Sequence, residues 1–413
     1  MNIGRHTFPN GLRLVHVMDK STQMVALNIL YNVGARDEDP QHTGFAHLFE
    51  HLMFGGSIHI PHYDAPLQLA GGENNAWTNN DVTNYFLTIP KQNVETGFWL
   101  ESDRMLSLDF NAGSLDVQRG VVMEEFKQVC LNQPYGDVGH LIRELSYKVH
   151  PYRWPTIGKE LSHIEQATLE EVKDFFFHYY APNNAILAVT GNITFDEALS
   201  LTGKWFSSIP SREVKPKNLP CEPVQLQQRR ITVERHVPID SLYMAFHMSD
   251  RLSRDYHAYD ILSDILCNGQ SSRLRQHLVQ DKGIFSSIDA YISGSIDPGL
   301  FQISGKPATG VSLEAAEAAV WEELDALQNN LIAEHELEKV KNKFESSYIF
   351  GNINYLNVAT NLAWFELTGQ AEDMECEVEK YRAVTAEYLL EVAANAFRPE
   401  NSNLLYYKRD RLS

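Results

Sequence analysis

The stretch MVALNILY, residues 24–31, decides the fold of this chain because a similar stretch, SLYMAFHM, follows at residues 241–248. Each is a short, mainly apolar run of the length of a buried β-strand. A helical pattern follows each run and ends near a glycine, at Gly55-Gly56 in the first case and at Asn268-Gly269 in the second. The two stretches therefore indicate two domains with the same order of elements.

A second pair of matching segments lies at the end of each half. Thr168 begins a helical pattern that leads to the turn Pro182-Asn183-Asn184 and an apolar run, and Thr385 begins another that leads to Pro399-Glu400-Asn401 and an apolar run. Both copies predict a helix, a proline-marked turn and a buried strand. Duplication of one domain explains this shared order. The alternative is that two unrelated domains share a generic strand-helix rhythm by chance.

The predicted domains are residues 1–210 and 227–413, joined by a Pro- and Lys-rich linker at residues 211–226. Strands and helices occur without strict alternation, which favours an α+β fold class in which each domain is a mainly antiparallel sheet packed with helices. Asn10-Gly11 lies between apolar runs and predicts a tight hairpin turn. In the second half, helices are predicted over residues 313–331, with Ser312 as the N-cap, and over residues 334–350.

The composition excludes several classes of protein. With 35 basic against 54 acidic side chains the net charge is −19, which argues against binding to nucleic acid. No run approaches the roughly 18 apolar residues of a membrane span. The N-terminus carries no secretory signal, so a cytoplasmic location is expected, or a periplasmic one if a leader has been removed. The four cysteines are widely spaced and predict neither disulfides nor a thiolate metal site.

The segment HLFEH, residues 47–51, carries the chemistry. On a helix His47 and His51 are one turn apart on the same face, so that both imidazoles can bind one tetrahedral metal ion. Glu50 lies roughly 60° around the helix from His47, within reach of a water molecule at that ion. Apolar residues surround these three, and a metal would offset the cost of burying them. A chance match to HxxEH and a purely structural pair of histidines are the alternatives.

A candidate third ligand lies on a later helix, predicted around residues 118–126. Val122, Phe126 and Val129 are expected on its buried stripe, and Glu125 falls beside that stripe. Glu124 points away, as an ordinary solvated residue would. A carboxylate at the border of a buried face is a plausible ligand, so Glu125 is predicted to complete the site with His47 and His51.

These features resemble the insulinase and pitrilysin family of zinc peptidases, whose inverted motif is HxxEH. The resemblance extends over most of the chain, and the residues that carry it, besides HLFEH, are Asn10-Gly11, Gly71-Gly72, Asn75-Ala76-Trp77-Thr78, Thr83-Asn84-Tyr85, Glu101–Arg104, His150-Pro151-Tyr152, Gly158 and Pro182-Asn183-Asn184.

The resemblance implies a function for each of these positions. It implies Zn²⁺ as the cofactor, His47, His51 and Glu125 as its ligands, and Glu50 as the general base of peptide hydrolysis. Peptide substrates would add as a strand along the segment that the residues Asn75, Ala76, Trp77 and Thr78 supply. It further implies that residues 1–210 form the catalytic domain, and that the two domains form half of a clamshell chamber.

The chain departs from the family pattern at several positions. Gln118 stands where family members usually have a glutamate, and it could still support the metal through a hydrogen bond. Val279 and Ser286 stand where many members carry an arginine and a tyrosine that stabilise the oxyanion. The second half also lacks the metal motif, since the residues aligned with His47, Glu50 and His51 are Asp260, Ser263 and Asp264.

The absent arginine and tyrosine suggest that the active site of this chain is incomplete. The expectation is a homologous partner subunit that supplies both residues, in a heterodimer or in a homodimer. Tyr291 could replace one of them, although a place in a strand suits it better. A non-catalytic assembly subunit or a peptide-binding subunit of a two-chain complex is the alternative function.

Overall fold

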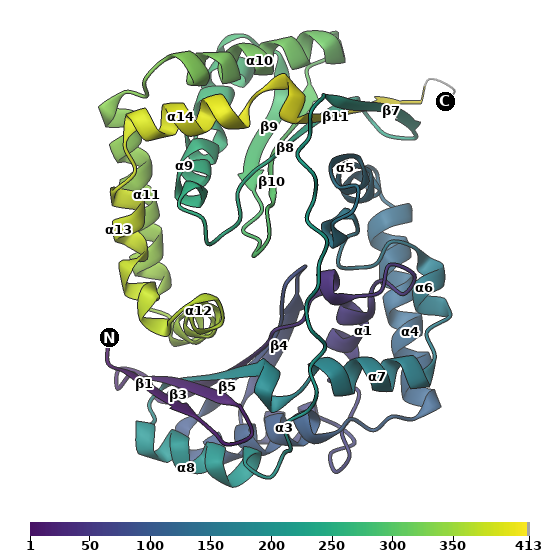
Figure 1. Cartoon of the computed structure of the whole chain (residues 1–413), viewed down its shortest axis with the longest axis vertical. Helices are drawn as coiled ribbons and strands as arrows, with labels where there is room; N and C mark the ends of the chain where they lie inside the picture. The colour runs from purple at the N-terminus through teal and green to yellow at the C-terminus, as the bar shows by residue number, and fades with distance from the viewer. Residues whose placement is uncertain (411–413) are drawn as a thin grey trace. The chain divides into compact units, whose positions relative to one another are not determined.

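The computed structural model of the chain describes residues 1–410 and divides into two compact units (Figure 1). The first unit is built from residues 1–129, 154–219 and 349–376, and the second from residues 130–153, 220–348 and 377 onward. These units are less continuous than the predicted domains 1–210 and 227–413. The segment 349–376 groups with the first unit because its helix packs on the first sheet.

The first unit contains a mainly antiparallel sheet of six strands. Their order is β1-β2-β6-β3-β5-β4, and only β2 and β6 run parallel. The predicted strand at residues 24–31 is confirmed as β3, and the predicted Asn10-Gly11 turn joins β1 to β2. The bounds are β1 Ile3–Thr7, β2 Arg13–Met18, β3 Met24–Tyr31, β4 Glu73–Thr78, β5 Thr83–Pro90 and β6 Ala185–Gly191.

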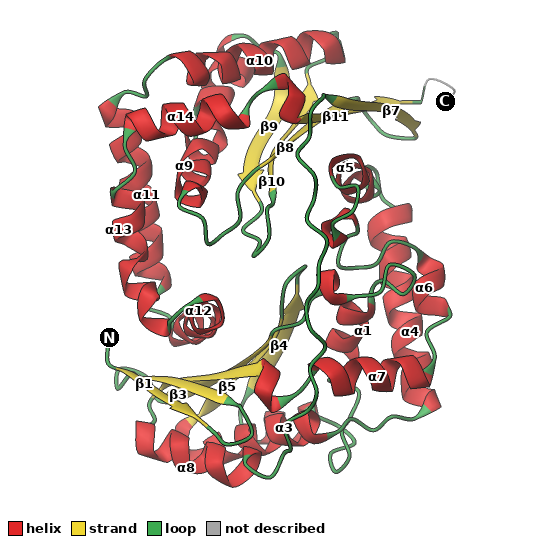
Figure 2. Cartoon of the chain, viewed as in Figure 1, coloured by secondary structure: helices red, strands yellow, loops and turns green. Residues whose placement is uncertain are grey.

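Helices cover both faces of this sheet (Figure 2). On one face α12 packs against β3 and β6, and on the other α3 and α8 pack against β5 and β2. The helices of the first unit are α1 Phe45–Leu52, α2 Asp64–Leu69, α3 Val94–Leu106, α4 Ala112–Phe126, α6 Leu161–Glu165, α7 Leu169–Tyr179, α8 Phe195–Phe206 and α12 Tyr355–Thr368.

The second unit contains a sheet of five strands in the order β7-β11-β8-β10-β9. The helices α9 and α10 pack on it, as does α5, which contacts β7, β8 and β11. The strands are β7 Arg229–Arg235, β8 Ser241–His247, β9 Phe285–Ile292, β10 Leu300–Pro307 and β11 Ser402–Arg409. The helices are α5 Val138–Ser146, α9 Asp255–Cys267, α10 Leu313–Asn329, α11 Glu334–Gly351, α13 Glu377–Arg382 and α14 Ala386–Ala396.

The two sheets share one topology. In both sheets two strands pair in parallel, and three further strands follow that each pair antiparallel with the strand before. The order β2-β6-β3-β5-β4 therefore corresponds to β7-β11-β8-β10-β9. The predicted helix starts also agree, because Thr168 caps α7 and Thr385 caps α14 through their hydroxyl groups. The fold is therefore α+β with two similarly built sheets, as expected from the sequence. A duplication remains the simplest origin for this agreement.

The segment between the two predicted domains has no helix or strand over residues 211–226. Its first part is fixed to the first unit by Lys217, whose ammonium group lies 2.8 Å from the Asp37 carboxylate. Its last part is fixed to the second unit by Gln225, which donates to the carbonyl groups of Glu400 and Ser402. In residues 1–410 no helix is long and apolar enough to cross a membrane.

Candidate metal centre

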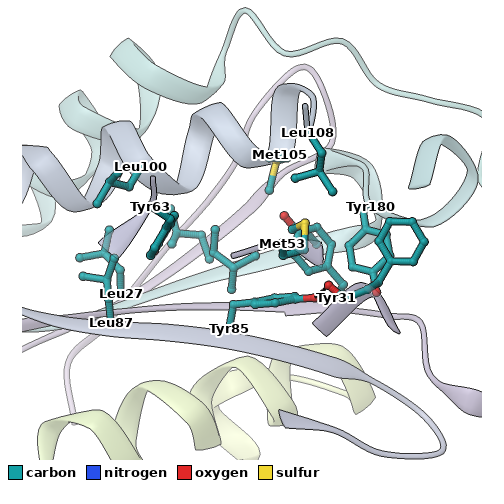
Figure 3. Packing of buried hydrophobic residues seen from close by; sticks show 14 of the residues in the cluster. Leu27, Tyr31, Met53, Tyr63, Tyr85, Leu87, Leu100, Met105, Leu108 and Tyr180 are labelled. Carbon is teal, nitrogen blue, oxygen red and sulfur yellow. Dashed lines mark hydrogen bonds between the residues drawn. The ribbon is translucent and has the colours of Figure 1, made fainter. Parts of the chain in front are cut away.

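The helix α1, which carries HLFEH, is held in place by buried aromatic residues that pack against it. Phe49 stacks on Tyr180 with ring centroids 4.9 Å apart, and the Tyr85 hydroxyl donates to the Phe49 carbonyl at 3.0 Å. Tyr31 contacts both tyrosines, and Figure 3 shows Tyr31, Tyr85 and Tyr180 together with Met53 from the end of the helix. Aromatic side chains bury large areas and prefer defined ring geometries. This packing therefore holds α1 in one place.

The N-terminus of α1 is capped from outside the helix by a buried carboxylate. Gly44 precedes α1 and has no side chain to cap it. Instead Glu38 accepts hydrogen bonds from the N–H groups of Gly44 and Ala46, both at 2.9 Å. Burial raises the pKa of Glu38 to about 8, although these two hydrogen bonds act in the opposite direction. Glu38 therefore satisfies the first N–H groups of the helix, as an N-cap side chain ordinarily does.

Three potential ligand atoms converge at α1. The Nε2 atoms of His47 and His51 lie 3.6 Å and 3.4 Å from the same oxygen of Glu125, and all three ligand atoms are within 4.8 Å of one another. Ligand atoms about 2.1 Å from one tetrahedral ion are about 3.4 Å apart, which is close to these separations. Two imidazoles and one carboxylate are a donor set that zinc accepts. The three side chains therefore fit a zinc ion.

Electrostatics at the centre also suit a cation. Burial lowers the pKa of His47, while the nearby Glu125 carboxylate raises it and His51 lowers it further. A lower pKa favours the neutral imidazole, which is the form that binds metal. Glu50 is half-buried on the same helix, and its negative charge contributes to the raised pKa of Tyr85, after burial as the main cause. The centre thus combines two imidazoles, of which His47 is shifted toward its neutral form, with two carboxylates.

The helix α4 presents Glu125 to the two histidines and turns Glu124 away. Glu124 pairs with Lys127 and its side chain is 58% exposed, compared with 40% for Glu125. The buried stripe was predicted correctly at Val122 and Phe126 but wrongly at Val129, which is 42% exposed. A π-helical turn at Lys127–Leu131 causes the difference, because its wider turn changes which side chains face inward.

The segment Asn75, Ala76, Trp77 and Thr78 lies in β4, which is an edge strand and within residues 1–410 pairs only with β5. The helix α1 packs against β4, so the potential ligands lie beside this edge. The Ala76 N–H donates to the side chain of Asn75 at 2.8 Å. An edge strand offers unpaired backbone groups to another extended chain. Binding of substrate by these four residues stays a prediction.

Gln118 lies on α4, two turns before Glu125, and its side chain is near Gly55, which follows the C-terminal end of α1. The other ring nitrogen of His47, Nδ1, is buried and has no hydrogen-bond partner within residues 1–410. Gln118 therefore makes no hydrogen bond to that atom in this structure. A supporting role for Gln118 stays a prediction.

Val279 and Ser286, which the sequence resemblance aligns with an arginine and a tyrosine, lie in the second unit. Val279 lies in a π-helical segment, Leu274–Asp281, and Ser286 lies on β9, where its hydroxyl donates to the Lys306 carbonyl. Tyr291 is a member of β9, as its sequence context suggested. On α9, Asp260 accepts a hydrogen bond from Tyr381, and the Ser263 hydroxyl donates to the backbone of Asp260.

Glu38 was not identified from the sequence. The available signal was indirect: Gly44 stands directly before a helix that carries two histidines and a glutamate, and it offers no side-chain cap. A buried helix start without a cap requires an acceptor from elsewhere. Which acidic residue of the preceding segment fills that place depends on the path of the loop, and the sequence pattern does not reveal it.

Two protein-family models match successive parts of the chain. The model described as "Insulinase (Peptidase family M16)" matches residues 13–156, and the model described as "Peptidase M16 inactive domain" matches residues 166–344. The first match contains all three potential ligands. The second lies mainly over the half without HxxEH.

Related proteins match over nearly the full length. A protein named zinc protease PqqE from Helicobacter pylori is 27% identical over 97% of this chain and 92% of its own length. An uncharacterized zinc protease, YmxG, from Bacillus subtilis is 26% identical over 84% of this chain and 83% of its own. The crystal structure of a protease from Helicobacter pylori matches with a TM-score of 0.92 at 27% identity, over 98% of this chain and 99% of that one.

Proposed function

Since the chain belongs to the insulinase family of peptidases (peptidase family M16), we propose that it is a zinc-dependent endopeptidase subunit. Its zinc would be held by His47, His51 and Glu125. The observation that carries this proposal is the convergence of these three ligand atoms from α1 and α4 within 4.8 Å of one another, beside the edge strand β4. The names of the similar proteins, which are zinc proteases, support it.

Zinc at this centre supplies Lewis-acid chemistry toward water and the scissile carbonyl. Glu50 takes the proton of the attacking water and passes it to the leaving amine. β4 binds the substrate as an added strand, and its main-chain hydrogen bonds orient the scissile bond with little regard for sequence. Asn75, Ala76, Trp77 and Thr78 are the residues of that edge.

We propose further that another subunit supplies the oxyanion donors. Val279 and Ser286 cannot stabilise a developing oxyanion as an arginine and a tyrosine do, and one such donor is worth about 3–4 kcal/mol in the barrier. A second copy of this chain carries the same Val279 and Ser286. A different, related chain that carries the arginine and tyrosine is therefore favoured over a homodimer.

The test measures zinc content and cleavage of a fluorogenic peptide by the purified chain, alone and with such a related chain. We expect one zinc per chain, weak cleavage alone and strong cleavage with the partner. Glu50→Gln is the control, because it should keep the zinc and lose the cleavage. A chain without zinc contradicts the proposal, and full turnover alone contradicts the partner requirement.

The second candidate function is a non-catalytic assembly or peptide-binding subunit. It is favoured by the replacement of the arginine and tyrosine by Val279 and Ser286. Retention of two histidines and two carboxylates at α1 and α4 argues against it, because a binding subunit does not need them. Bound zinc without cleavage, even when the partner is present, would select this function instead.

A further inference from the structure

A cavity of about 370 Å³ lies in the second unit, away from any residue assigned so far. Its walls come from the segment that begins α9, from α13 and the turn after it, and from α14. The lining residues are Arg251, Leu252, Ser253, Arg254, His257, Lys380, Ala383, Val384 and Tyr388. Four of these nine side chains are basic and none is acidic. In a chain with a net charge of −19, such a lining points to an anionic ligand.

The carboxylates near the cavity already pair with neighbouring side chains and do not line the cavity itself. Glu377 accepts a hydrogen bond from Arg251 and pairs with His257 and Lys380. Asp255 accepts from the Tyr388 hydroxyl. These contacts hold the basic side chains and the tyrosine in place, and they leave the cavity itself without a carboxylate. The site is therefore both positive and partly preorganised.

Arg254 is the side chain best able to meet a ligand. Its guanidinium lies over the Tyr388 ring, 4.4 Å from the centroid, and makes no hydrogen bond or ion pair within residues 1–410. The residue is exposed and immediately precedes α9. Stacking on the ring fixes the plane of the guanidinium while its N–H donors stay available.

We propose that this cavity binds a phosphate monoester of a small organic molecule. Arg251 and Arg254 approach from the α9 side and Lys380 from α13, so three cationic donors face one space. A phosphate offers three oxygens to such a set, whereas a carboxylate offers two. Leu252, Val384 and the Tyr388 ring supply apolar wall for the organic part. The inference does not depend on the metal centre, which lies in the other unit.

The experiment is calorimetric titration of the full chain, freed of zinc by dialysis, with phenyl phosphate and with benzoate at fixed ionic strength. We expect saturable binding of phenyl phosphate and at least tenfold weaker binding of benzoate. Arg254→Gln should weaken phenyl phosphate by about tenfold or more, because it removes a charge-assisted hydrogen bond. Lys215→Gln is the matched control, since Lys215 is exposed in the segment 211–226 and should change the affinity less than twofold.

The thermal midpoint of each variant, measured without ligand, shows whether it is folded. Arg254→Gln removes an exposed side chain with a single ring contact, so its midpoint should match that of the wild type. Lys380→Gln provides a second variant for the same cavity and should also weaken binding. The proposal is overturned if the wild type shows no saturable binding, if Arg254→Gln binds like the wild type, or if benzoate binds as tightly as phenyl phosphate.

Discussion

The helices α1 and α9 follow corresponding strands of two sheets with the same topology, yet they carry different chemistry. On α1, Glu38 caps the first turn, and His47 and His51 face Glu125. On α9, the aligned Asp260 is bound to Tyr381, and burial raises the pKa of its carboxyl group. A shared scaffold therefore does not carry the chemistry, which depends on a few side chains and on what fixes them.

The largest expected effect is on kcat, which should depend on Glu50 of α1 but not on Ser263, the aligned residue of α9. Glu50→Gln should lower kcat for peptide cleavage by about 10³-fold, because it removes the general base. Ser263→Ala should leave kcat within twofold, since Ser263 bonds only to the backbone of its own helix. Steady-state kinetics with the partner present measure both. Equal losses in the two variants would contradict the assignment of the chemistry to α1.

The next effect distinguishes Glu125 from its neighbour Glu124. Glu125→Gln should weaken zinc binding by about 100-fold or more, because even supporting residues of a metal site are worth 10- to 100-fold. Glu124→Gln should change it less than twofold, since Glu124 is exposed and contacts Lys127. Competition with a chelator of known affinity gives both values. A larger loss in Glu124→Gln would mean that α4 presents the other carboxylate.

A smaller effect tests the cap that Glu38 provides at the start of α1. At pH 9, above the pKa of about 8, both Glu38 oxygens accept. Glu38→Gln then keeps one acceptor oxygen but turns an NH₂ group toward a backbone N–H, so it should lower the free energy of unfolding by about 1–2 kcal/mol. Because α1 also positions two ligands, zinc affinity should fall by about tenfold. Asp39→Asn is the control, since Asp39 is exposed in the same loop. Unchanged zinc affinity in Glu38→Gln would limit Glu38 to a stabilising role.

The same carboxylate predicts a pH dependence of stability. The pKa of Glu38 is raised from 4.5 to about 8, so between these values the folded chain holds a proton that the unfolded chain releases. Its contribution to the free energy of unfolding is full below pH 4.5 and is lost as the pH rises toward 8. Denaturant titrations of zinc-free protein measure this slope. Glu38→Gln should make it shallower, and an identical slope in both proteins would contradict the raised pKa.

The sequence predicted the parts of the molecule that depend on local pattern. The apolar runs at β3 and β8 and the caps Thr168, Thr385 and Ser312 were predicted correctly from spacing and residue type. Glu125, rather than Glu124, faces His47 and His51, as the helical period predicted. Each of these depends on neighbours within a few positions along the chain, which is the range over which periodicity and capping act.

Features that depend on tertiary contacts were not predictable in the same way. α12 follows the second sheet's helices in sequence but packs on the first sheet, and a helical pattern does not specify which sheet it covers. The π-helical turn that exposes Val129 breaks the regular period on which the prediction relied. Glu38 reaches α1 only through the fold of the intervening loop. The placement of α12 and the capping by Glu38 share one cause, since both depend on packing between distant parts of the chain.

The smallest expected effect concerns the one supporting position at which the chain departs from its family. Gln118 lies on α4 two turns before Glu125, at the place where family members usually carry a glutamate. Gln118→Glu would restore that carboxylate, and a carboxylate that accepts a hydrogen bond from a histidine ligand makes that histidine a stronger ligand. Zinc affinity should therefore rise, by about tenfold. Gln68→Glu makes the same change of charge on an exposed residue of α2 and should leave the affinity unchanged. Equal gains in both variants would show a general effect of added negative charge. A gain confined to position 118 would mean that the glutamine at this position limits the zinc affinity of the chain.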